Sequence, residues 1–207
     1  MKAEPHHNAL RFEGQQGHVE SYFLRANHPT RPLAVWLKAT ILAPLHGPAI
    51  AESWFIFFDG EKNLTFAGKQ TVPFSAGAFS ADGTAIKLAG TDFVFGANGS
   101  ARGTTPSAEG TARFDLTWKK QESPIALPLR MMPFRFLRTG AFPKSKLETP
   151  FPFLRLSGRI ELPDGTLELE NWLGAQGHNW ANVIEQRDVK SRRDLRRDSD
   201  HGDHDGH

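Results

Sequence analysis

The chain has 207 residues and no cysteine, and its 25 lysines and arginines nearly balance 23 aspartates and glutamates, which leaves a formal net charge of +2. The lack of cysteine excludes disulfides, thiolate nucleophiles and cysteine-ligated metals. The mixed charges show no basic stripe with exposed aromatic residues, which argues against a nucleic-acid-binding protein. The aromatic content, 16 Phe and five Trp, is enough to fill the core of one large all-β domain.

The first 16 residues carry no apolar run of the length that a signal peptide needs. No stretch of about 18 apolar residues, the length that crosses a bilayer, occurs anywhere in the chain. We therefore expect residues 1–16 to be a flexible segment, the protein to be cytoplasmic, and no part of it to span a membrane.

Strand patterns begin directly after this segment. In the first one, alternation places His18, Glu20, Tyr22 and Leu24 on one face, and Val19, Ser21, Phe23 and Arg25 on the other. Further segments rich in β-branched and aromatic residues follow, separated by Pro, Asp-Gly and Asn-Gly turns. They cover 33–42, 50–58, 64–66, 85–88, 92–95, 111–118, 154–162 and 166–170. Residues 111–118 alternate strictly, which is typical of a half-buried antiparallel strand.

Two stretches depart from the strand pattern. Residues 121–152 are rich in Pro, Phe, Met and Arg, and 131–138 fit either a short amphipathic helix or a loop over the mouth of a barrel. Residues 181–207 are charged and have almost nothing to bury, so we expect a disordered His-, Asp- and Arg-rich tail. The tail repeats histidine at positions 201, 204 and 207, but we predict no metal site there because an ordered site needs more than this composition. The prediction is an all-β protein, an antiparallel lipocalin-like barrel or sandwich over residues 17–180.

The sharpest local motif is the glycine-framed sequence Gly-Ala-Gln-Gly-His-Asn-Trp at 174–180. An imidazole can exchange a proton near neutral pH, so His178 could serve a bound ligand while Asn179 orients a water or a carbonyl. The alternative is a turn whose His178 and Trp180 only cap the barrel.

Two segments together, His18–Arg25 and Gly177–Trp180, resemble the hydroxyneurosporene synthase (carotenoid 1,2-hydratase) and AttH-like group. The resemblance spans about residues 17–180 and implies a lipocalin-type β-domain around an apolar pocket, the N-terminal one of two such domains. The family pattern has Gly where this chain has Ala181. From that residue on the sequence becomes highly charged, and we interpret this abrupt change as the product of a frameshift or an early stop.

For the site, the resemblance implies acid-catalysed hydration of an isoprenoid double bond. In that reading His178 is the proton donor or relay, Asn179 its orienting partner and Glu20 a second acid. Trp36, Trp54 and Trp180 would be ligand-binding walls, whose aromatic faces stabilise a carbocation. The ordinary alternatives are a solvated strand residue for Glu20 and plain core for Trp36 and Trp54.

Three functions stay open. We favour a binding module that holds an apolar, isoprenoid or lipid-like small molecule in a β-barrel cavity. The alternatives are a hydratase or isomerase acting on such a molecule, and an inactive remnant of a two-domain protein that self-associates through an exposed domain-facing surface. We expect no cofactor, no metal and no nucleic-acid partner.

Overall fold

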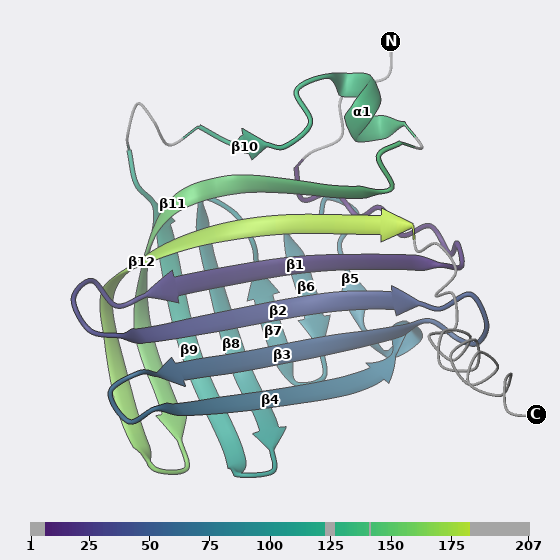
Figure 1. The fold of residues 1–207 in the computed structure, drawn as a ribbon. Coiled ribbons are helices and arrows are strands. Elements are labelled where there is room, and N and C mark those ends of the chain that lie inside the picture. The colour runs from purple at the N-terminus through teal and green to yellow at the C-terminus, as the bar shows by residue number, and fades with distance from the viewer. Residues whose placement is uncertain (1–6, 123–126, 141, 183–207) are drawn as a thin grey trace, which may run out of the picture.

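The computed structural model describes residues 7–122, 127–140 and 142–182, and its strands form one antiparallel sheet (Figure 1). The strands are β1 (His18–Asn27), β2 (Leu33–Ala43), β3 (Ile50–Asp59), β4 (Leu64–Pro73), β5 (Ala78–Phe79), β6 (Ala85–Leu88), β7 (Thr91–Val94), β8 (Asn98–Ser107), β9 (Gly110–Lys120), β10 (Leu129–Arg130), β11 (Ser145–Leu162) and β12 (Gly165–Asn182). One helix, α1 (Arg135–Thr139), and a 3-10 turn at Phe74–Ala76 are the helical elements of this part of the chain. The predicted all-β antiparallel class is confirmed.

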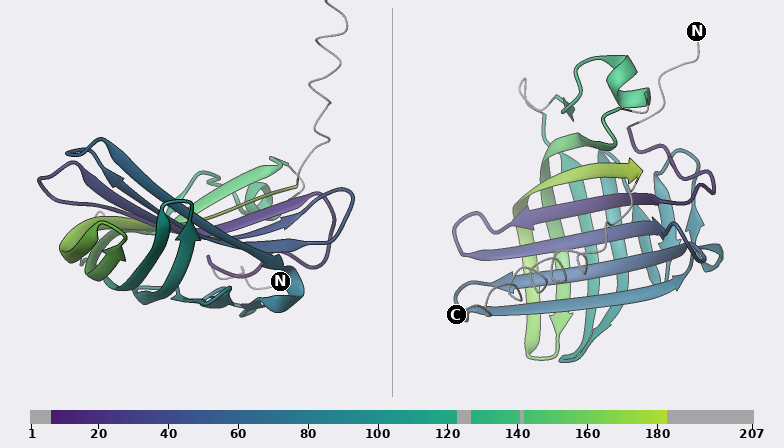
Figure 2. Two further views of the ribbon diagram at one scale, coloured as in Figure 1. Left: turned by 90° about the horizontal axis from the view of Figure 1, so that it is seen from below. Right: turned by 45° about the vertical axis from the view of Figure 1, so that its right-hand side comes forward.

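The sheet curls into a half-barrel. Its strand order is β4-β3-β2-β1-β12-β11-β9-β8-β7-β6-β5, with β10 paired to β11. Strands β11 and β12, 18 residues each, join the two halves, and the curl brings β1–β4 across β6–β9 (Figures 1 and 2). At the seam β4 approaches β8 so closely that a Cβ on Gly68 would lie 2.8 Å from the Pro106 carbonyl oxygen.

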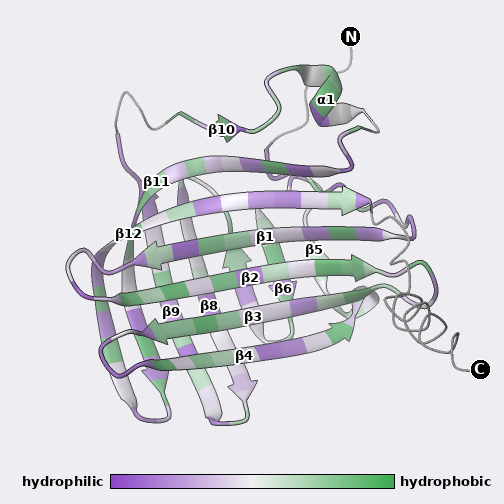
Figure 3. Ribbon diagram, viewed as in Figure 1, coloured by the Kyte–Doolittle hydropathy of each residue, from purple (hydrophilic) through white to green (hydrophobic). Residues whose placement is uncertain are grey.

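The core lies on the concave face. Strand β9 shows the predicted alternation, with Ala112, Phe114, Leu116 and Trp118 buried and the residues between them exposed. The same alternation of hydrophobic and hydrophilic residues runs along most strands (Figure 3). Phe55 of β3 stacks on Phe114 of β9 with ring centroids 5.0 Å apart, which ties the two halves of the sheet together.

Residues 7–12 lie against one end of this half-barrel. Phe12 is buried and packs edge-on against Phe74, with ring centroids 4.9 Å apart. The Leu10 amide donates to the carbonyl of Ala81 at 3.1 Å. This backbone hydrogen bond and this aromatic contact attach residues 10–12 to the sheet.

Several segments differ from the sequence prediction. The predicted turn at Asn98-Gly99 is the start of strand β8, and β12 runs to Asn182, well past the strand predicted over 166–170. Strands β4 and β11 are also longer than the predicted 64–66 and 154–162. The segment 131–138 contains the short helix α1, which lies beside β11 (Figure 1). The tail predicted over 181–207 lies, from residue 183 on, outside the described residues. Among the described residues no helix has both the length and the apolar character needed to cross a bilayer.

Candidate functional site

The structure brings Glu20 and His178 into direct contact inside the half-barrel. In the register of β1 with β12, Tyr22 lies opposite His178 and Glu20 opposite Trp180, so all four side chains share the concave face. The Nε2 atom of His178 lies 2.9 Å from Oε1 of Glu20, and both residues have an exposed fraction of 0%. The two strands therefore position a fully buried pair of titratable groups.

The Glu20 carboxylate accepts hydrogen bonds from several directions. Oε1 accepts from the Tyr22 hydroxyl at 2.7 Å and from the Arg11 amide at 2.9 Å, and Oε2 accepts from the Phe12 amide at 2.8 Å. His18 Nε2 lies 3.2 Å from Oε2. Burial alone would raise the pKa of Glu20, but hydrogen bonds from His178, His18 and Tyr22 and the charge of His178 lower it to about 2. Glu20 is thus a carboxylate, an acceptor rather than a proton donor at neutral pH.

His178 is held equally firmly at both ring nitrogens. Its Nδ1 lies 2.7 Å from the backbone carbonyl of His7, which can only accept, so Nδ1 donates. Its Nε2 faces the ionised Glu20, which also accepts, so both ring nitrogens of His178 lie against acceptor oxygens. The Tyr22 ring stacks on the imidazole with centroids 4.3 Å apart. Burial, together with the nearby charge of Glu20, raises the pKa of Tyr22 well above its usual range, so Tyr22 stays a donor.

The same network holds the N-terminal strap, as we call residues 7–12. His7 Nδ1 lies 2.6 Å from Oε2 of Glu148, and the Asn8 side chain accepts from Gln176 Nε2 at 3.0 Å. Gln176, with an exposed fraction of 0%, in turn accepts from the Gly96 amide at 2.9 Å. Buried side chains joined by such hydrogen bonds stabilise one defined arrangement, so this cluster fixes the strap to the sheet.

The other residues predicted for the site do not converge on this pair. Asn179 neighbours His178 along β12 and therefore lies on the opposite, convex face. Trp36 is 37% exposed on that face, edge-on to Phe23. Trp54 is there too and donates from Nε1 to Glu52 at 3.1 Å. Only Trp180 lies beside His178, with ring centroids 4.9 Å apart.

The glycine-framed motif lies within strand β12, not in the turn considered above. Gly177 is opposite Phe23 of β1, and a Cβ on Gly177 would lie 2.2 Å from Cζ of that ring. The glycine is therefore needed because an aromatic side chain from the neighbouring strand covers it, a pairing known to compensate for glycine in sheets.

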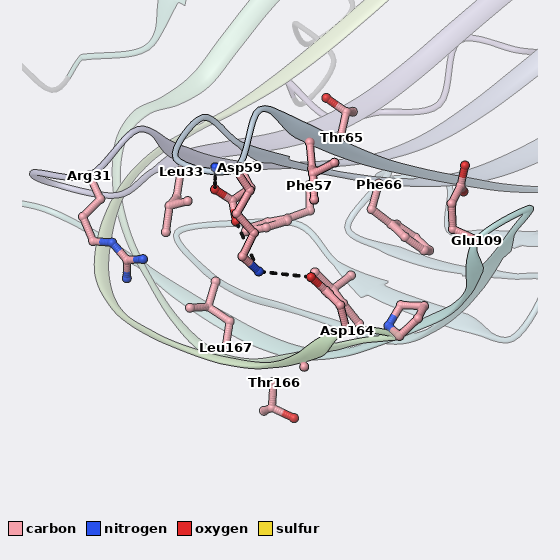
Figure 4. A pocket seen from close by; sticks show the side chains of 15 residues that line it. Arg31, Leu33, Phe57, Asp59, Thr65, Phe66, Glu109, Asp164, Thr166 and Leu167 are labelled. Carbon is pink, nitrogen blue, oxygen red and sulfur yellow. Dashed lines mark hydrogen bonds and ion pairs between the residues drawn. The ribbon is translucent and has the colours of Figure 1, made fainter.

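A pocket lies at the opposite end of the half-barrel, where four hairpins meet (Figure 4). Its volume is about 530 Å³. Apolar walls come from Leu33, Phe57, Phe66, Leu162 and Leu167, and charged residues surround the opening: Arg31, Asp59, Lys62, Glu109 and Asp164. None of the six residues predicted for the site lines it.

Two ion pairs join hairpin tips at this opening. Lys62 Nζ, in the β3–β4 turn, lies 3.1 Å from Oδ2 of Asp164 in the β11–β12 turn (Figure 4). Arg31, in the β1–β2 turn, donates to both carboxylate oxygens of Glu61 at 2.8 and 2.6 Å. The local sequence gave no sign of the pocket, because its lining is drawn from four turns that are distant along the chain.

No cluster of three or more histidine, aspartate and glutamate side chains suited to a metal ion occurs in the described ranges. His18, Glu20 and His178 lie together but are unsuited to a cation, because backbone N–H groups of Arg11 and Phe12 donate to the Glu20 carboxylate. An N–H group that donates to a carboxylate oxygen occupies the position where a cation would bind, and its partial positive charge repels the cation.

Comparison with known proteins identifies the fold. No family model matches the sequence, and no curated protein matches it. A Nitrosomonas europaea protein provisionally named AttH, solved as a crystal structure, superposes with a TM-score of 0.56 at 17% identity, over 86% of this chain and 57% of that one. The structure of CghA with Sch210972 gives a TM-score of 0.49 at 9% identity, over 81% of this chain and 47% of that one. The chain thus has an AttH-like fold and spans little more than half the length of the AttH-like protein.

Proposed function

We propose that this protein binds an apolar small molecule in the pocket at the hairpin end of the half-barrel. One observation carries the proposal: a space of about 530 Å³ whose inner walls are leucine and phenylalanine and whose opening is charged. Small-molecule sites commonly measure roughly 300–1,000 Å³ and combine apolar walls with a few polar groups. The AttH-like fold, a curled sheet around an interior, is compatible with such a binding domain.

The charges at the opening favour a ligand without an acidic head group. Arg31 is engaged by Glu61 through two hydrogen bonds, and Lys62 is paired with Asp164. Asp59 and Glu109 add two further carboxylates to the lining. A carboxylate or phosphate on the ligand would meet neutralised cations and additional anions, whereas a neutral alcohol or an aldehyde would not.

Hydration by acid catalysis at His178, Asn179 and Glu20 stays a prediction. The buried, ionised Glu20 and the outward position of Asn179 favour a structural role for the cluster. The other alternative, a remnant that self-associates, also stays a prediction, motivated by the 57% coverage of the AttH-like protein.

A tryptophan placed in the pocket tests the proposed function. Leu167→Trp fills the cavity from β12, whereas Leu45→Trp makes the same change in the β2–β3 turn, outside the pocket lining. Titration with the neutral apolar dye Nile red should give an affinity at least about 10-fold lower for Leu167→Trp, equivalent to about 1.4 kcal/mol.

The Leu45→Trp control should bind the dye like the unmodified protein, and thermal unfolding should show both variants folded. Dye binding that is equal in the two variants, or absent from the unmodified protein, would overturn the proposed function.

A further inference from the structure

An apolar surface that the proposed function does not use projects beside β11. It consists of Leu127, Leu129, Met131, Phe134, Phe136 and Phe142, which we call the β10–α1 patch. Each of these side chains is between 58% and 76% exposed. Scattered exposed apolar residues are ordinary, but a group of this size within 16 residues of chain marks an interaction surface.

The geometry of the segment leaves these side chains uncovered. Strand β10 pairs with β11 alone, through Leu129 opposite Thr149 and Arg130 opposite Glu148, so the segment stands off from the curled sheet (Figure 1). The rings of Phe134 and Phe136 stack on each other with centroids 5.8 Å apart and stay 60% and 66% exposed. The patch is therefore a protruding apolar feature rather than part of the core.

The charge of the same stretch has one sign. Between Ser123 and Leu147 the sequence contains Arg130, Arg135, Arg138, Lys144 and Lys146, and no aspartate or glutamate. Lys146 is buried and donates to the Pro143 carbonyl at 2.8 Å, and Glu148, opposite Arg130 on β11, is buried too, whereas Arg130 and Lys144 are exposed. Arg138 donates to the carbonyls of Met132 and Pro133, both at 2.9 Å, which fixes the turn that presents the phenylalanines. Aromatic rings among basic residues are the composition that binds an anionic lipid interface.

We propose that the β10–α1 patch docks the protein peripherally on an anionic membrane surface, with Phe134, Phe136 and Phe142 inserted and the exposed Arg130 and Lys144 at the lipid head groups. Protruding, short and irregular segments suit a lipid interface because a fluid surface needs no complementary shape. The patch lies beside the first half of β11, whereas the pocket includes Leu162 at the far end of that strand. Docking would thus leave the pocket opening in solution, and it does not depend on the proposed function.

Sedimentation with lipid vesicles tests the proposal on the full chain. The unmodified protein should bind vesicles of phosphatidylcholine with phosphatidylglycerol more tightly than vesicles of phosphatidylcholine alone, and high salt should weaken binding because it screens the charges. Phe134→Ser with Phe136→Ser should lower the partition coefficient at least about 10-fold, since two rings no longer leave water.

The matched control is Phe58→Ser with Val94→Ser, which removes two exposed apolar side chains elsewhere on the sheet and should leave vesicle binding unchanged. Unfolding midpoints and Nile red affinity should be the same in all three proteins. The proposal is overturned if no vesicle is bound, if the lipid charge makes no difference, or if the phenylalanine variant binds like the control. It is also overturned if the phenylalanine variant instead abolishes a dimer detected by sedimentation velocity, since the patch would then join two copies of the chain.

Discussion

The two ends of the half-barrel use polar residues in opposite ways. At the strap end, Glu20 and His178 are completely buried, and every hydrogen-bonding atom of the Glu20 and His178 side chains has a partner. At the hairpin end, Lys62 and Asp164 are more than half exposed and surround a cavity. Buried polar groups must be satisfied internally, so they fix one conformation, whereas exposed pairs can exchange with water. We therefore assign rigidity to the strap end and ligand access to the hairpin end.

The largest expected effect comes from breaking the buried network at Glu20. Glu20→Gln keeps the size of the side chain but removes the charge that faces His178, Tyr22 and two backbone amides. Removing one partner of a buried ion pair costs about 3–5 kcal/mol, so the free energy of unfolding should fall by that amount. Denaturation in urea measures the change.

Glu170→Gln is the matched control, since Glu170 is an exposed glutamate of the strand that also carries His178, and its effect should stay within about 0.5 kcal/mol. The pH dependence gives a second check. Because the folded pKa of Glu20, about 2, lies below its ordinary value of 4.5, the stabilisation is fully present above pH 4.5 and is lost as the pH falls toward 2. In Glu20→Gln the free energy of unfolding should therefore change less with pH between 4.5 and 2 than it does in the unmodified protein. The same pH dependence in Glu20→Gln and in the unmodified protein would contradict the assigned network.

The fold was predictable from sequence because its main signal is local. Period-2 alternation in 111–118 identifies β9, and in 18–25 it already places His18, Glu20 and Tyr22 on one face. Strand β8 was missed because glycine, serine and threonine carry little hydrophobic pattern. The end of β12 was missed because Gly174 and Gly177 weaken the strand signal, and the ring that covers Gly177 comes from another strand.

The site was predicted less well because its determinants are distant along the chain. Glu20 and His178 are 158 residues apart, and the burial of Glu20 depends on the strap as well as on β12. Sequence spacing suggested that Asn179 would assist His178, but strand alternation sends adjacent side chains to opposite faces. Trp36 and Trp54 were assigned to the interior from residue type alone, whereas both lie on the convex face.

A smaller effect should follow from pushing the strap away while leaving Glu20 intact. Gly83 has a φ of +66°, and a Cβ there would lie 1.5 Å from the backbone oxygen of Asn8. Gly90 has a similar φ of +76°, but the nearest atom to its Cβ would be 4.0 Å away. Both alanine substitutions carry the same backbone strain, so the difference between them isolates the collision with the strap.

We expect Gly83→Ala to destabilise the protein by about 1–3 kcal/mol more than Gly90→Ala does, the typical cost of overpacking. Hydrogen exchange followed by mass spectrometry should show faster exchange in residues 7–12 of the Gly83 variant alone. If the two variants exchange and unfold alike, the strap is not the element that makes this end rigid.

The smallest effect is expected at the hairpin end. Lys62→Met removes the ion pair to Asp164, which joins two hairpin tips at 3.1 Å, and Lys87→Met removes the exposed pair to Asp92 at 3.8 Å, away from the pocket. Exposed pairs contribute little because water and salt screen them and two long side chains must be ordered. Neither variant should shift the midpoint of thermal unfolding measurably, and only Lys62→Met should change the rate at which Nile red enters or leaves the pocket. A loss of stability in Lys62→Met comparable to that of Glu20→Gln would mean that both ends are rigid, and ligand access would then have to be sought elsewhere on the sheet.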